Sequence, residues 1–150
     1  MNTDFRDLLF GFSGRINRTK YWIAVAIYWA VSMALGLVAF LTLVGGEIAR
    51  STTMVTPFFI FAAVVYIAVA VSAIAVGIKR LHDRDKTGWW LLVFYLVPGL
   101  ISTVGTRMHG PAILNLVSAA ITIWMIVELG LLHGTPGPNR YGANPLPATA

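Results

Sequence analysis

The sequence predicts an all-α, polytopic membrane protein with four transmembrane helices and a short N-terminal interfacial helix. Of its 150 residues, 57% are hydrophobic and only 11% are charged, whereas about 25% of the residues in a soluble domain are charged. Long apolar runs alternate with short polar segments, and a bilayer core of about 30 Å requires roughly 20 apolar residues per helix. We therefore expect residues 1–150 to form a single membrane domain.

Residues 3–12 are expected to form the interfacial helix. Its apolar side chains recur at the spacing of one helix face: Phe5, Leu8, Leu9 and Phe12. Because so short a helix is marginal in water, it should lie in the headgroup region with this face directed inward.

The first two spans are predicted at residues 22–44 and 57–78. The first contains no charged residue, and Ala26, Ala30 and Ala34 recur in it every four residues. Small residues at this spacing let helix backbones approach closely in lipid. We therefore expect this face to pack against another helix.

The third span, residues 89–106, contains Pro98 and Gly99 and is just long enough to cross, at about 27 Å for 1.5 Å per residue. Pro98 should kink it, because proline lacks the N–H that a helix needs and clashes with the preceding turn. A re-entrant segment that turns back at Pro98 and Gly99 is the alternative. The fourth span, residues 112–132, carries one acid, Glu128.

The basic residues predict the orientation. Nine of the eleven Lys and Arg residues precede the first span, lie in loop 79–88 or belong to the tail 133–150, and two lie on the opposite side. Under the positive-inside rule, both termini, the loop and the tail are cytoplasmic. Four prolines and three glycines in the tail exclude a continued helix and leave open whether the tail folds back over the cytoplasmic face or is disordered.

Three polar segments together resemble a known family. GRINRTKYW at 14–22, KRLHDRDKTGWW at 79–90 and GTPGPNRYG at 134–142 occur in the order seen in the bacterial inner-membrane proteins catalogued as domain of unknown function 805. The resemblance implies a small polytopic protein of the bacterial inner membrane and supplies no activity. Two positions depart from the family pattern, with Lys79 where Arg is usual and Asp85 where Gly is usual.

We expect the three segments to form one cytoplasmic surface of basic and aromatic residues that binds anionic lipid or a partner protein. Its predicted residues are Arg15, Arg18, Arg80, His82, Asp83, Arg84, Lys86, Trp89, Trp90 and Arg140. Each Lys or Arg near a membrane surface contributes about 1 kcal/mol of attraction to anionic headgroups. The competing interpretation is that these residues only orient and anchor the protein.

The adjacent pair His82 and Asp83 resembles an acid–base site, but neighbouring residues of a helix do not face each other. We expect them to form internal hydrogen bonds and ion pairs with Arg80 or Arg84, and we predict no catalytic residue, metal site or cofactor. For Glu128, pairing with Lys79 or Arg80 is expected, and a proton-coupling role is the alternative.

The preferred function is therefore a small inner-membrane interaction or accessory protein. A small oligomeric transporter or channel comes second, and an enzyme acting on lipid headgroups comes third. Membrane lipids, a protein partner and a second copy of the chain are the expected partners. Nucleic acid is not, because basic residues beside spans are first of all topology signals.

Overall fold

The computed structural model describes residues 4–49, 55–107 and 112–146. Within these ranges, all of the regular secondary structure is helical. In chain order the helices are α1 (Phe5–Phe10), α2 (Arg18–Ala49), α3 (Val55–Asp83), η1 (Leu92–Leu96), α4 (Val97–Arg107), α5 (Ala112–Ile126) and η2 (Val127–Leu131). The segments η1 and η2 are π-helical turns, each continuous with its neighbouring α-helix. The loop position Arg50 and the last four tail residues fall outside the described ranges.

Among the described residues, three helical stretches are long and apolar enough to cross a membrane: Arg18–Gly45, Thr56–Asp83 and Ala112–Leu131. The predicted third span corresponds to a shorter apolar helix, Leu92–Arg107. The all-helical membrane architecture is therefore confirmed, with three long apolar helices and one short one.

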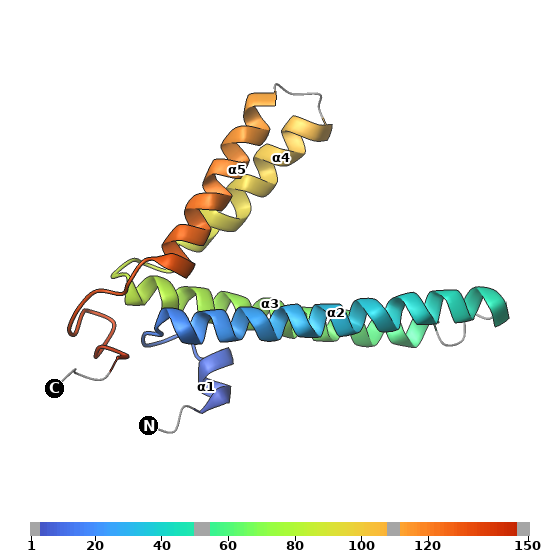
Figure 1. The fold of residues 1–150 in the computed structure, drawn as a ribbon, viewed down its shortest axis with the longest axis horizontal. Coiled ribbons are helices and arrows are strands. Elements are labelled where there is room, and N and C mark those ends of the chain that lie inside the picture. Colours follow the sequence, from blue (N-terminus) through green and yellow to red (C-terminus); the bar gives the residue numbers. More distant parts are fainter. Residues whose placement is uncertain (1–3, 50–54, 108–111, 147–150) are drawn as a thin grey trace.

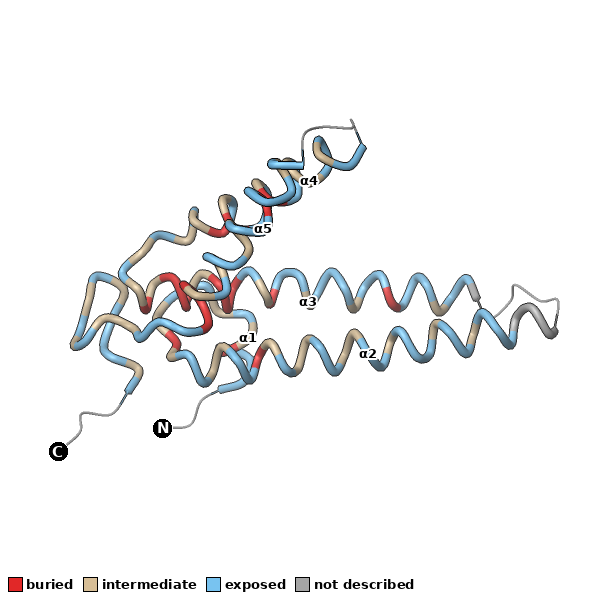
Figure 2. Tube along the Cα trace, turned by 45° about the horizontal axis from the view of Figure 1, so that its top comes forward, coloured by how far each residue is buried: buried red, intermediate tan, exposed pale blue. Residues whose placement is uncertain are grey.

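The helices form two hairpins, α2 with α3 and α4 with α5, which diverge from a common end (Figure 1). α1 and the tail lie at this common end, which we call the junction. Buried residues concentrate at the junction, whereas exposed residues dominate the rest of both hairpins (Figure 2). Large apolar side chains such as Leu37, Phe61 and Leu116 are exposed along the hairpins. This is the pattern expected of surfaces that face lipid.

Helix α1 is shorter than the expected 3–12. The Asp4 carboxylate caps it by accepting from the Arg6 N–H at 2.9 Å, and Gly11 ends it. Leu8 is buried against Ile16, Ala24 and Val76, and the partly buried Leu9 packs against the same cluster, so both leucines anchor α1 to the α2–α3 hairpin. Phe5 and Phe10 on the same short helix stay exposed.

The α2–α3 contact uses a different face of α2 from the one predicted. Ala26, Ala30 and Ala34 are all exposed, so the small-residue face does not pack within this chain. Ala24 is fully buried instead, and Tyr28 shares a 2.7 Å hydrogen bond with Ser72 of α3. The contact therefore lies on the side of α2 roughly opposite the alanine face, since Ala24 and Tyr28 are four residues apart and are offset by two residues from Ala26 and Ala30.

A π-helical turn lies directly before Pro98 in the chain. Leu92–Leu96 forms the wide turn η1, and the helix then continues through Pro98 and Gly99 to Arg107. A local π turn is one way in which a helix accommodates a proline that cannot donate to the preceding turn. The Pro98 carbonyl accepts from the Ser118 hydroxyl of α5 at 3.1 Å, which joins the two helices at this point.

Candidate functional site at the junction

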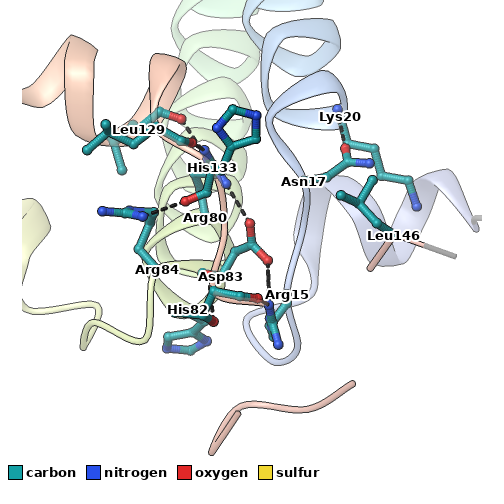
Figure 3. Close-up of polar contacts among 12 residues, drawn as sticks. Arg15, Asn17, Lys20, Arg80, His82, Asp83, Arg84, Leu129, His133 and Leu146 are labelled. Atoms are coloured by element: carbon teal, nitrogen blue, oxygen red, sulfur yellow. Dashed lines mark hydrogen bonds and ion pairs between the residues drawn. The ribbon is translucent and has the colours of Figure 1, made fainter. Parts of the chain in front are cut away.

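The three polar segments that carry the family resemblance meet at the junction. Arg15 of the first segment pairs with Asp83 of the second, and its guanidinium also donates to the carbonyls of Thr135 and Gly137 in the third. Figure 3 shows Arg15, Arg80 and Asp83 converging there. We call Arg15, Arg80, Asp83, Arg84, Lys86 and Glu128 the ion-pair network.

Asp83 is the centre of the network. One carboxylate oxygen accepts from Arg15 at 3.0 and 3.1 Å, and the other accepts from Arg80 at 2.6 Å. The side chains of Arg15, Arg80 and Asp83 are 1%, 0% and 2% exposed. Two buried cations therefore depend on one buried carboxylate, and removing it would leave both without their counter-charge.

Arg80 also binds the carbonyl groups at the C-terminal end of the second hairpin. Its Nε donates to the Leu129 carbonyl at 2.6 Å, and its Nη2 donates to the Leu132 carbonyl. Since the last carbonyls of a helix lack intrahelical partners, a guanidinium placed here satisfies them and favours the negative end of the helix dipole. Arg80 thus links α3 to the end of η2.

Glu128 is paired, but with different residues from those expected. Its Oε1 lies 3.1 Å from Arg84 and 3.0 Å from Lys86. The expected partners are occupied elsewhere: Arg80 binds Asp83 and the η2 carbonyls, and Lys79 donates to the carbonyls of Asp7 and Leu8 in α1. The expectation of pairing with Lys79 or Arg80 was therefore wrong.

The turn after α3 explains how Lys86 reaches Glu128. The Lys86 N–H bonds to the Leu81 carbonyl at 2.9 Å and the Asp85 N–H to the His82 carbonyl at 3.0 Å, the two bonds of a Schellman motif. Asp85 occupies the left-handed position of this motif with φ of 54°, where glycine carries the smallest steric cost. The departure from glycine at Asp85 therefore falls on the position where the backbone favours glycine most.

His82 and Asp83 do not form a dyad. The His82 Nδ1 lies 3.2 Å from the Gly14 carbonyl, and its ring stacks on Tyr141 with centroids 3.8 Å apart. Because a carbonyl only accepts, Nδ1 donates in this contact. Within the described ranges, no group of three or more His, Cys, Asp or Glu residues could hold a metal ion.

The described part of the tail folds back onto the end of α3. The Thr135 N–H bonds to the Asp83 carbonyl at 2.8 Å, and the Asn139 amide donates to the His82 carbonyl at 2.9 Å. A Cβ at Gly134 would collide with the Asp83 carboxylate. Of the two alternatives for the tail, the ordered one therefore holds for residues 133–146.

Several contributors to the junction were not predicted. Lys79, Thr135 and Asn139 were absent from the expected set, although all three lie within or beside the quoted segments. Trp22, the last residue of the first segment, also contributes, because its indole N–H donates to the Gly130 carbonyl at 3.0 Å. The available signal was residue type for Lys79, which is buried, since a buried ammonium needs specific acceptors; Asn139 is half-buried and Trp22 is exposed.

The remaining predicted residues lie at the edge of the junction. Trp89 is 76% exposed, and Trp90 packs edge-on against Trp124 with the Lys86 ammonium 5.3 Å from its ring centre. Arg140 pairs with Asp85 at 3.2 Å in solvent. Arg18 is exposed and lies at the mouth of a groove between α2 and η2.

Comparisons with known proteins agree with this architecture. The family model described as "Protein of unknown function (DUF805)" matches residues 9–143. The chain is 29% identical to "Uncharacterized protein YiiR" of Escherichia coli (strain K12) over 89% of this chain and 85% of that protein. It is 29% identical to "Inner membrane protein YhaH" of the same organism over 90% of this chain and 87% of that protein.

It is also 28% identical to "Inner membrane protein YhaI" of that strain, over 90% of this chain and 86% of that protein. No solved structure gives a significant match. The family match covers most of the chain, and the relatives with a stated location are inner membrane proteins. The chain is therefore a multi-pass inner-membrane protein that belongs to the DUF805 family.

Proposed function

We propose that this protein is a non-catalytic accessory protein of the inner membrane that binds anionic phospholipid headgroups of the cytoplasmic leaflet with its junction surface. In this proposal four helices cross the membrane, Leu92–Arg107 being the short one, and the junction faces the cytoplasm. The distribution of basic residues along the chain supports this orientation, because nine of the eleven precede the first span or belong to loop 79–88 or the tail.

The observation that carries the proposal is an excess of cations over carboxylates in the ion-pair network. Asp83 is shared by Arg15 and Arg80, and Glu128 is shared by Arg84 and Lys86. Each carboxylate is therefore paired with two cations, and each cluster retains a net charge of about +1. This fixed positive charge lies where a membrane surface presents anionic headgroups, and such charges attract them by about 1 kcal/mol each.

The internal pairing limits how the surface can bind. All three guanidinium nitrogens of Arg15 and of Arg80 donate to protein oxygens. These residues contribute through their field, and direct hydrogen bonds to a headgroup must come from exposed cations at the edge. Long-range attraction of this kind weakens with salt, because the Debye length is about 10 Å at 0.1 M ionic strength.

The two competing functions have less support. Glu128 lies in the last turns of its helix and pairs with two cations, whereas coupling acids of transporters usually lie near the midplane. His82 is held by a backbone carbonyl and a stacked tyrosine, which leaves the junction without an arranged acid–base pair. A binding role is the one that these arrangements favour.

The proposal is tested by reconstituting the protein in nanodiscs that contain equal amounts of phosphatidylglycerol and phosphatidylcholine and measuring which lipid remains bound after mild extraction. We expect enrichment of phosphatidylglycerol that decreases as salt is raised. The Lys86→Gln variant should reduce the enrichment, and Arg107→Gln, at the opposite end of the molecule, should not. Equal retention of both lipids by the unmodified protein would contradict the proposal.

The orientation has its own test, because the chain contains no cysteine. Thr87 and Thr106 are both exposed; Thr87 lies in the turn after α3, at the junction, and Thr106 in the last turn of α4. In intact spheroplasts, a membrane-impermeant thiol reagent should label Thr106→Cys and should not label Thr87→Cys. Labelling of Thr87→Cys would place the junction on the periplasmic side.

A further inference from the structure

A groove of about 540 Å³ lies between the start of α2 and η2. Along α2 it is lined by Arg18 and Thr19 at one end, which we call its mouth, and then by Trp22, Ile23 and Ala26; Gly130 and Leu131 line it from η2. The polar side chains are therefore at one end, and the apolar ones extend about 12 Å from it, at 1.5 Å per helical residue. We infer that this groove is a specific binding site for one anionic phospholipid, with the phosphate at Arg18 and Thr19 and an acyl chain along Trp22, Ile23 and Ala26.

Arg18 supplies the charge complementarity. It is exposed, and among the described residues no carboxylate forms an ion pair with it. This distinguishes it from Arg15, Arg80 and Arg84, whose donors are used inside the protein. Since guanidinium binds phosphate oxygens through parallel hydrogen bonds, Arg18 is a donor at the junction that is suited to direct contact with a headgroup.

The start of α2 adds to this charge. Asn17 caps the helix by accepting from the Lys20 N–H at 2.9 Å, while the amides of Arg18 and Thr19 belong to the first turn, which has no intrahelical acceptor. The helix therefore directs the positive end of its dipole toward the same mouth. The Arg18 side chain and the N-terminal end of α2 therefore both favour a negatively charged ligand.

A close contact builds the wall of the groove. The Trp22 ring lies over Gly130, where an added Cβ would stand 2.7 Å from Cζ2 of the ring, and its N–H donates to the Gly130 carbonyl. Trp22 can occupy this position only because residue 130 has no side chain. The shape of the groove therefore depends on a feature that is separate from its charge.

The inference deepens the proposed function and rests on it, because it assigns the anionic lipid to one place. It can be tested with photoactivatable phosphatidylglycerol and phosphatidylcholine that carry the same diazirine acyl chain, each added to nanodiscs containing the whole protein. Cross-links are located by mass spectrometry at groove residues and at Ile123, an exposed apolar residue of α5 outside the groove. We expect the phosphatidylglycerol to phosphatidylcholine ratio to be about 5-fold higher in the groove than at Ile123, the equivalent of about 1 kcal/mol.

Two variants separate charge from shape. Arg18→Gln should bring the groove ratio down to that at Ile123, whereas Arg6→Gln, exposed at the same end but outside the groove, should not change it. Gly130→Ala should lower the cross-linking of both lipids in the groove while retaining Arg18, because it displaces Trp22 and so changes the shape that holds the shared acyl chain. Addition of inorganic phosphate should have no effect, since the acyl chain contributes to binding.

Equal ratios in the groove and at Ile123 would overturn the site. If phosphatidylglycerol were then enriched around Arg84 and Lys86, the proposed function would stand and only its location would be wrong. Absence of enrichment anywhere would refute both. A groove without cross-links to either lipid, or a ratio abolished by inorganic phosphate, would also overturn the assignment to a phospholipid.

Discussion

Asp83→Asn tests whether the ion-pair network holds the two hairpins together. The substitution keeps the size of the side chain and removes its charge, so the buried Arg15 and Arg80 lose their shared carboxylate. Leaving a buried charge without its partner destabilises proteins by about 3 to 5 kcal/mol. The lower end of this range applies here, because both arginines keep their bonds to backbone carbonyls. We therefore expect the free energy of unfolding to fall by about 3 kcal/mol.

The assay is equilibrium unfolding in mixed micelles of dodecyl maltoside and sodium dodecyl sulfate, followed by circular dichroism. Asp85→Asn is the matched control, because it removes the same charge only two residues from Asp83. Asp85 pairs with Arg140 in solvent, and the two side chains are 47% and 57% exposed respectively. Exposed ion pairs contribute about 0 to 1 kcal/mol. If Asp83→Asn cost no more than Asp85→Asn, the network would not stabilise the fold and the central role of Asp83 would be refuted.

Three further substitutions can be measured by the same unfolding assay. Gly134→Ala should lower the free energy of unfolding by about 1 to 3 kcal/mol, because the added Cβ would collide with the Asp83 carboxylate. The control Gly36→Ala should not lower it, because a Cβ at Gly36 would have no atom within 4 Å. Asp85→Gly should leave stability unchanged or raise it by up to about 1 kcal/mol, because relief of the left-handed backbone offsets the loss of an exposed ion pair; a marked decrease would contradict this account. Tyr28→Phe should cost about 0.6 kcal/mol, the average for a hydrogen bond between membrane helices, and a cost that persists in the Ser72→Ala background would show that the bond is not its source.

The sequence predicted the helical membrane class because composition alone determines it. A chain with 57% hydrophobic and 11% charged residues has far fewer charges than a soluble domain, and apolar runs of roughly 20 residues have the length of membrane-spanning helices. The three polar segments were also expected to meet, since the positive-inside rule assigned them to one side. The segments do meet in the structure, because Arg15 of the first segment contacts Asp83 of the second and Gly137 of the third.

The individual partners could not be read from the sequence. Lys79, Arg80 and Arg84 are neighbours in the chain, yet they point toward α1, Asp83 and Glu128 respectively. Which one meets Glu128 depends on the helix face at which α3 ends and on the Schellman turn at Asp85. Periodicity gives the relative faces of one helix and contains no information on where a second helix crosses it.

The alanine face of α2 illustrates the same limit. Ala26, Ala30 and Ala34 have the spacing of a helix-packing face, but α3 contacts α2 through Ala24 and Tyr28. Small residues permit close approach without requiring it, whereas a tyrosine hydroxyl in lipid needs a hydrogen-bond partner. The polar contact therefore decides which face is used, and Ala26 remains open to the groove beside Arg18.

The position of the ion-pair network accounts for the divergence of the two hairpins. Arg80 joins α3 to the carbonyls at the end of η2, and Arg84, in the turn after α3, binds the His133 carbonyl just beyond η2. Asp83 joins α3 to Arg15, which precedes α2. These bonds fix the hairpins at one end, while their far ends separate (Figure 1). Along the diverging part, the exposed apolar side chains have lipid as their solvent and gain little by packing together, because helix association in a bilayer has no hydrophobic driving force. A protein organised in this way concentrates its specific interactions at one membrane surface, which is where an anionic headgroup would meet Arg18.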